Sequence, residues 1–280
     1  MLEKMTESTL WDKAYALRQE GKFKESYDVL CEIATGGRDP MEKASALLGG
    51  ITDLITLKDF RSACKQLETI KSILARSDAT PTLNQDQRLR LNAEADLQEA
   101  LIAVAQAFTE EQQKETLAAF DSMIKKYGPS LDVPFLKDIK EAIYGERAFI
   151  LADLGFFTEA LPALQEVEVS HPKNSSVIFY LGYCHWSTKN YHLARKTLEK
   201  AIALGLSGNF EFRAHLALGC TLCETGYYGH ARVELERARA LATPYDLTQG
   251  KVFQWLEYCY KQLGMTNEAA QYAHLHNPKQ

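Results

Sequence analysis

Residues 175–206, SSVIFYLGYCHWSTKNYHLARKTLEKAIALGL, decide the fold of this chain. Apolar residues recur at helical spacing on both sides of a short polar break, Thr-Lys-Asn. This spacing predicts two amphipathic helices joined by a tight turn. Gly182 and Ala194 are small enough for the two antiparallel helices to approach each other closely. Leu181 and Leu198 fill the space beside them.

The same pattern recurs along the chain. In five of the predicted hairpins, the second helix opens with a ring residue, and a small residue follows three positions later. The clearest pairs are Phe23/Ser26, Phe60/Ala63, Phe157/Ala160, Tyr191/Ala194 and Tyr228/Ala231. They are separated by 37, 97, 34 and 37 residues. One hairpin of this size cannot bury its own apolar face, so a regular interval indicates hairpins that stack on their neighbours.

The intervals divide the chain into predicted hairpins. Seven of them are predicted, at residues 10–34, 41–74, 87–127, 136–169, 175–206, 210–242 and 250–275. The third departs from the pattern, because its sequence predicts one long helix of about 20 residues followed by a partner helix. We predict a single helical-repeat domain over residues 1–280. It has two possible arms, 1–127 with two repeats and the atypical hairpin, and 134–280 with four repeats.

The order of residue types in 175–206 resembles a known repeat. A large residue, Leu-Gly and a ring residue are followed in the second helix by Ala, a large apolar residue and Ala, which is similar to the tetratricopeptide-repeat pattern. The resemblance covers most of the chain, since several units fall in phase. It implies an all-α, right-handed superhelical solenoid of antiparallel helix hairpins with a concave groove. Members of the family mostly bind peptides, helices or extended segments of partner proteins in that groove.

Helix geometry predicts which residues face the groove. Each residue turns a helix by about 100°, so Phe179, Tyr183 and Trp186 lie about 120° from the packing stripe of Gly182. In the family this second stripe looks into the groove. With the same offset in the other hairpins, we predict the partner-binding residues Trp11, Tyr15, Phe149, Phe179, Tyr183, Trp186 and Tyr258. An alternative interpretation places about half of these rings in the core between repeats.

The predicted groove differs from the best-known groove of the family, a carboxylate clamp of Lys, Asn and Arg on three successive units. The matching positions here hold Phe179, Tyr183, Leu216, Cys220 and Gln254. A largely apolar stripe predicts an amphipathic helix or an extended apolar peptide as the ligand. We therefore predict a non-enzymatic protein–protein interaction scaffold or adaptor. A self-assembling repeat protein, whose exposed rings pack on a second copy, is an alternative.

Cysteine chemistry gives another alternative. Cys220 and Cys223 form the only CxxC motif among six cysteines, and on a helix their thiols lie one turn apart. This leaves open a thiol- or metal-responsive sensor. A zinc site needs four converging ligands, so packing of small thiols in the core is the favoured interpretation, and we expect no metal and no cofactor. HExxH, GxSxG and a phosphate-binding glycine loop do not occur, so we expect no enzyme.

Charge and hydropathy limit the partners. The net charge is −5, and basic residues are interleaved with acidic ones, whereas a nucleic-acid-binding protein usually shows a basic face. No apolar run reaches the roughly 18–20 residues of a membrane span. The first residues, MLEKMTESTLWDK, lack the apolar core of a signal peptide. We expect a soluble, cytoplasmic protein that binds a protein or peptide and no nucleic acid.

Overall fold

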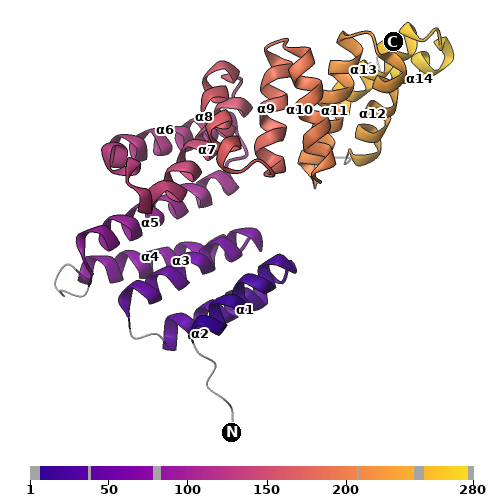
Figure 1. Cartoon of the computed structure of the whole chain (residues 1–280). Helices are drawn as coiled ribbons and strands as arrows, with labels where there is room; N and C mark the ends of the chain where they lie inside the picture. Colours follow the sequence, from indigo (N-terminus) through magenta and orange to yellow (C-terminus); the bar gives the residue numbers. More distant parts are fainter. Residues whose placement is uncertain (1–6, 37–38, 78–82, 207, 243–248, 277–280) are drawn as a thin grey trace. The chain divides into compact units, whose positions relative to one another are not determined.

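The chain folds into paired helices. The computed structural model describes residues 7–36, 39–77, 83–206, 208–242 and 249–276. In these residues it contains fourteen α-helices, two short 3-10 helices and no strand (Figure 1). The α-helices pair into seven hairpins in the predicted order. The prediction of an all-α fold of stacked hairpins is therefore confirmed.

The ends of the chain add little to this description. Within the described ranges, the helices lack a stretch that is long and apolar enough to cross a membrane. Residues 1–6, which contain part of the sequence that we compared with a signal peptide, lie outside the described residues.

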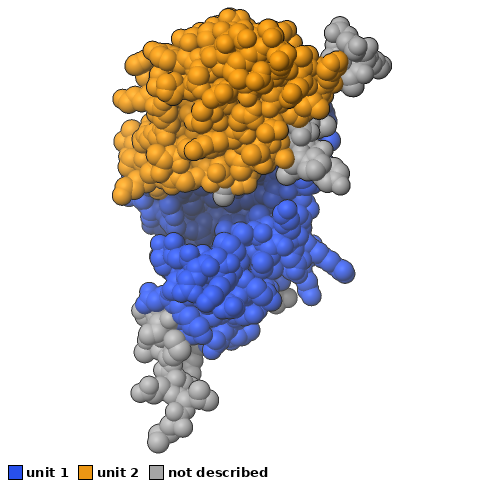
Figure 2. Space-filling model, turned by 90° about the vertical axis from the view of Figure 1, so that its right-hand side faces the viewer, with its two compact units in different colours: residues 1–143 blue, residues 144–280 orange. Residues whose placement is uncertain are grey.

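Two compact units make up the chain, residues 1–143 and residues 144–280 (Figure 2). The prediction of one domain with arms at 1–127 and 134–280 stays a prediction. The helices that begin in unit 1 are α1 (Glu7–Gln19), α2 (Phe23–Gly36), α3 (Pro40–Thr56), α4 (Phe60–Ser77), α5 (Gln85–Gln106), α6 (Glu110–Tyr127), η1 (Gly128–Asp132), η2 (Pro134–Leu136) and α7 (Lys137–Asp153). The helices that begin in unit 2 are α8 (Phe157–Ser170), α9 (Ser175–Ser187), α10 (Tyr191–Ala203), α11 (Asn209–Glu224), α12 (Tyr228–Leu241), α13 (Gln249–Gln262) and α14 (Thr266–His276).

Six hairpins turn in the same way. One residue in each of these turns has a positive φ: Gly21, Lys58, Gly155, Lys189, Gly226 and Gly264, with φ between 60° and 89°. The next amide then donates to a carbonyl five residues back, as from Asn190 N–H to the His185 oxygen at 2.8 Å. This is the Schellman motif, which ends a helix and satisfies its last carbonyl groups.

The third hairpin lacks this turn, which explains why its sequence departs from the pattern. After the 22-residue α5, Ala107 adopts an extended conformation. Thr109 then starts α6 with a capping box, in which its hydroxyl accepts from the Gln112 amide at 3.2 Å. The atypical hairpin at 87–127 is therefore a pair of long helices joined by a different connection.

Close helix contact in the regular hairpins depends on glycine. A Cβ atom on Gly182 would lie 2.7 Å from the Leu198 Cγ, and one on Gly219 would lie 2.6 Å from the Leu235 Cγ. Both distances are too short for a real side chain. The prediction that Gly182 permits close approach of two helices is confirmed.

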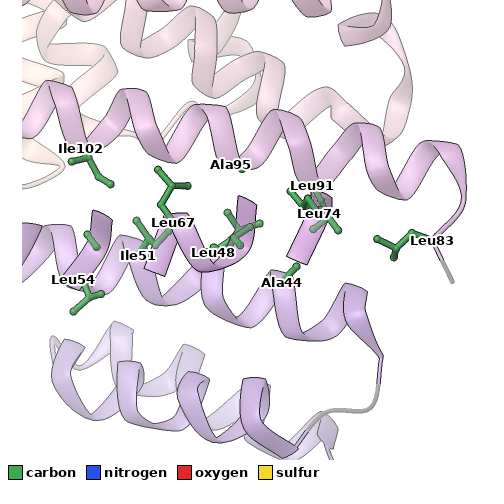
Figure 3. Close-up of a cluster of buried hydrophobic side chains, with 12 residues drawn as sticks. Ala44, Leu48, Ile51, Leu54, Leu67, Leu74, Leu83, Leu91, Ala95 and Ile102 are labelled. Carbon is green, nitrogen blue, oxygen red and sulfur yellow. The ribbon is translucent and has the colours of Figure 1, made fainter. Parts of the chain in front are cut away.

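A core cluster of unit 1 is built from α3, α4 and α5. Leu48 and Ile51 of α3 point toward Leu67 of α4 and toward Leu91 and Ile102 of α5 (Figure 3). All five side chains are buried. Burial of each such side chain stabilises the fold by about 1.5–3 kcal/mol. The core thus fixes α3 and α5 side by side, which positions the surface that these two helices present.

Candidate functional site

Aromatic side chains gather around α9 in unit 2. Seven rings are connected by centroid distances of 4.5–6.0 Å: Phe149, Phe157, Phe179, Tyr180, Tyr183, Trp186 and Phe210. Four of them lie on α9, and the others come from α7, α8 and α11. We call this set the α9 aromatic cluster. Such pairs contribute about 0.5–1.5 kcal/mol each beyond the area they bury.

Arg213 of α11 lies at the centre of the α9 aromatic cluster. Its guanidinium carbon is 5.2 Å from the ring centroids of both Phe179 and Tyr183, and 5.5 Å from that of Tyr180. Its Nη2 also pairs with the Asp153 carboxylate at 2.6 Å. One cation therefore holds rings of α9 and the end of α7 together.

Charge and burial keep this arrangement in one protonation state. Burial would lower the pKa of Arg213, but the Asp153 carboxylate outweighs it and the pKa is raised. Burial, aided by the same carboxylate, raises the pKa of Tyr180. The Tyr180 hydroxyl therefore stays protonated at neutral pH, and it donates to Asp153 at 2.9 Å. Arg213 and Tyr180 therefore keep their protons at neutral pH, and the contacts that they make hold the rings of the cluster in a defined arrangement.

The start of α9 is set by a cap. The Asn174 side chain accepts hydrogen bonds from the amides of Ser176 and Val177, at 3.1 and 3.2 Å. An asparagine cap of this kind stabilises a helix by about 1 kcal/mol. Because it fixes the first turn, it also fixes which ring of α9 faces which neighbour.

The α9 aromatic cluster contains four of the predicted partner-binding residues. Phe149, Tyr183 and Trp186 are half-buried and keep part of their rings exposed. Phe179 is completely buried. In this conformation its ring supports Tyr183, with a centroid distance of 6.0 Å, and offers no surface to a partner. The angular offset from Gly182 alone could not distinguish a partly exposed ring such as Tyr183 from a completely buried ring such as Phe179.

Tyr258 lies in a separate group on α13. Its side chain is 42% exposed, and its ring contacts those of Tyr228 and Trp255 at 6.2 and 5.9 Å. No contact that the structure describes connects it with the α9 aromatic cluster. The predicted partner-binding residues of unit 2 therefore fall into two separate groups, the α9 aromatic cluster and the group around Tyr258.

The remaining two predicted residues lie on α1 in unit 1. Trp11 lines a groove of about 440 Å³ that is bounded by α1, α3, α5 and the first turns of α7. Leu48 and Thr52 of α3 line this groove as well. Tyr15 is 66% exposed and is not among the lining residues. We call this surface the unit 1 groove.

Sequence reasoning did not single out Arg213 or Asp153. Arg213 lies one turn before Leu216, so extension of the predicted stripe toward the start of α11 would have found it. Asp153 stands in the last turn of α7, where the helix dipole disfavours a carboxylate. An acidic residue there is a signal for a nearby cation.

The thiols of the CxxC motif lie in the core. Cys220 and Cys223 are buried, and burial raises the pKa of Cys220 well above its usual value. A hydrogen bond with Cys259 of α13, together with burial, raises the pKa of Cys223. The structure thus places Cys223 beside Cys259. The Nδ1 atom of the nearby His215, on the same helix, lies 2.6 Å from the Glu234 carboxylate. Among the described residues, no group of three or more His, Cys, Asp or Glu side chains is arranged to hold a metal ion.

Comparison with known proteins identifies the fold. No protein-family model and no curated protein sequence matches the chain. Among solved structures, a signal-transduction ATPase with a tetratricopeptide repeat sensor from Pyrococcus horikoshii has a TM-score of 0.59 at 12% identity. The match covers 98% of this chain and 42% of that one. The apo form of RapI has a TM-score of 0.55 at 13% identity, over 98% of this chain and 76% of that one.

These likenesses establish the class of protein at the level of fold. The chain has the tetratricopeptide-repeat fold, as its sequence pattern predicts. A tetratricopeptide repeat protein from Parabacteroides merdae is also similar, at 17% identity over 83% of this chain and 78% of that one. Its TM-score of 0.49 is too low to add to the argument.

Proposed function

We propose that the protein is a non-enzymatic interaction scaffold that binds a partner peptide or helix. The α9 aromatic cluster is the principal contact surface, with the half-buried Tyr183 and Trp186 as the members that contact the partner. Phe149 borders it, and Phe179 supports it from below. Trp11, Tyr15 and Tyr258 provide further contacts elsewhere on the chain.

One observation carries this proposal: the half-buried Tyr183 ring, which contacts the Trp186 ring, is held in place by the largely buried Arg213. Arg213 fixes the Tyr183 ring and is itself fixed by Asp153. Rigid aromatic side chains lose little conformational entropy when they bind, and they are enriched among residues that dominate interface energy. The cluster is therefore organised before any partner arrives.

Capture from a native lysate tests the proposal. The bait is the full chain, either wild type or carrying Tyr183→Ser and Trp186→Ser. A matched control carries Phe108→Ser and Tyr227→Ser, which remove two exposed rings outside the cluster. We expect a protein that the wild type and the control retain and the cluster variant loses. Equal capture by all three chains, with equal helicity in circular dichroism, would rule out the α9 aromatic cluster as the contact surface.

A thiol sensor is the second candidate, favoured by the contact between Cys223 and Cys259. A peroxide would take two electrons and two protons from the two thiols, and a disulfide and water would form. This bond would join α11 to α13. The predicted pair, Cys220 and Cys223, lies on α11 alone. A disulfide between these two residues would therefore not connect α11 to α13. Burial of both Cys223 and Cys259 makes this chemistry slow, so we rank it second.

Intact mass after treatment with hydrogen peroxide distinguishes these cases. The sensor requires the loss of two hydrogens in the wild type and no such loss in a Cys259→Ser variant. If the wild-type mass is unchanged while the chain stays folded, Cys223 and Cys259 serve only to pack the core.

Self-assembly is the third candidate, in which the exposed rings pack against a second copy. Sedimentation equilibrium addresses it directly. A mass that remains at the 31.5 kDa of one chain at high concentration excludes it.

A further inference from the structure

The unit 1 groove carries an unequal number of charges. Among the described residues that line it, Arg90 is the one cation, and Glu94 and Asp138 are the carboxylates. Arg90 Nε pairs with Glu94 at 3.0 Å, and its Nη2 pairs with Asp138 at 2.6 Å. One guanidinium is thus shared between two carboxylates, which leaves an excess negative charge.

Burial makes this excess costly in the free chain. The Glu94 side chain is 22% exposed, and burial raises the pKa of its carboxyl. Arg90 opposes this rise, and the neighbouring Asp138 adds to it. A second cation near Asp138 would relieve the repulsion between the two carboxylates.

Gln98, another residue that lines the groove, has a hydrogen-bond acceptor without a donor among the described residues. The Gln98 Nε2 donates to the Thr52 hydroxyl at 3.3 Å. The Gln98 Oε1 is buried, and no described residue donates a hydrogen bond to it. A buried acceptor without a donor destabilises the free chain, and a ligand that supplies an N–H group would recover part of this free energy.

The groove also has apolar and aromatic lining residues. Trp11, Leu48, Leu97 and Ile139 line it beside the charged residues. Its volume of about 440 Å³ lies within the range of about 300–1,000 Å³ that is usual for ligand pockets. The groove can therefore take a long side chain together with parts of its apolar neighbours.

We propose that the unit 1 groove binds an arginine side chain that a partner peptide or helix carries between apolar residues. A guanidinium is planar, has five N–H donors and stacks on aromatic rings, so one group can serve a carboxylate, an amide oxygen and the Trp11 ring. Asp138 is the carboxylate that is free to share, since its side chain is 63% exposed. The inference rests on the proposed scaffold function and specifies the chemistry of the partner.

Nuclear magnetic resonance of the full chain tests this proposal. The chain has three tryptophans, Trp11, Trp186 and Trp255, so ¹⁵N-labelled indoles report the groove and two places in unit 2. The probes are acetyl-Leu-Arg-Leu-amide and its counterpart with citrulline, the neutral isostere of arginine. We expect the arginine peptide to shift the Trp11 signal and to bind about tenfold more tightly than the citrulline peptide.

Two matched variants examine the charge. Asp138→Asn leaves one carboxylate for one guanidinium, so the preference for arginine should disappear. Asp132→Asn makes the same change in net charge at an exposed residue that pairs with Lys140 outside the groove, so the preference should remain. Equal binding of both peptides to the wild type, an unchanged preference in Asp138→Asn, or an unmoved Trp11 signal at millimolar peptide would each overturn the inference.

The outcome is independent of the test of the α9 aromatic cluster. If a captured partner shifts Trp186 and the arginine peptide leaves Trp11 unmoved, the scaffold function stands and the arginine site fails. If the cluster variant captures all partners while Trp11 responds to arginine, the cluster fails as the contact surface and the groove stands.

Discussion

Single glycines set how closely the helices of a hairpin can pack. Gly182 faces Leu198 at a distance that excludes a methyl group. We predict that Gly182→Ala destabilises the chain by about 1–3 kcal/mol, because Leu198 must leave its position. Gly229→Ala is the matched control, since a Cβ there would meet nothing within 4 Å. It should be neutral or stabilise by up to about 1 kcal/mol. Urea denaturation measures both, and equal effects would contradict the packing argument.

Glu146 on α7 predicts a pH dependence. Burial raises the pKa of its carboxyl to about 7, compared with about 4.3 in an unfolded chain. Between these values the folded chain holds a proton that the unfolded chain has lost, so stability falls as pH rises through this window and stays lower above it. Glu146→Gln should therefore be more stable than the wild type at pH 8, by up to about 3 kcal/mol, and similar at pH 4.

Thermal unfolding at both pH values checks this prediction. The exposed Glu115 provides a control, because Glu115→Gln makes the same chemical change without burial. If Glu146→Gln behaves like Glu115→Gln at pH 8, the carboxyl of Glu146 is not destabilised by its surroundings.

At the scale of the element, the turn between paired helices is a repeated unit. Four of the six Schellman turns place glycine in the left-handed conformation, and Lys58 and Lys189 occupy it in the other two. A lysine there is strained, so Lys189→Gly should stabilise the chain by about 0.5–1 kcal/mol. Gly226→Ala should destabilise it by about 1–2 kcal/mol, although its Cβ would have free space. Opposite signs in urea denaturation support the argument, and equal signs contradict it.

Periodicity predicts elements well where each one repeats its neighbours. The ring and small residues at the start of the second helix, such as Tyr191 and Ala194, located five hairpins because packing requires them at fixed spacing. The third hairpin was found only as a helical pair, since its long helices and capped connection follow no repeat.

The candidate site was predicted less completely, because it depends on contacts between hairpins. The offset from Gly182 found Tyr183 and Trp186, but it could not show that Phe179 is buried beneath them. Arg213 comes from another hairpin, and no local pattern in the sequence connects it to the rings of α9. Contacts between residues of different hairpins are fixed by packing. The spacing of residues in one sequence does not show which of these contacts form.

At the scale of the whole molecule, each unit presents a different surface. Unit 2 carries an aromatic cluster that is organised around Arg213, and unit 1 carries a groove with excess negative charge. A partner that binds both surfaces would need apolar residues that contact the α9 aromatic cluster, and an arginine elsewhere in its sequence that enters the unit 1 groove. The hairpins present these surfaces mainly on their first helices, α1, α3, α5, α7, α9 and α11.

Hydrogen–deuterium exchange on the full chain, alone and with a captured partner, tests the central claim most directly. Our account predicts that the partner slows exchange in peptides from α9 and from the end of α7, around Asp153. Peptides from the second helices α10 and α12 should be unaffected. Slower exchange confined to α10 and α12, with α9 unchanged, would contradict the proposal that the α9 aromatic cluster binds the partner.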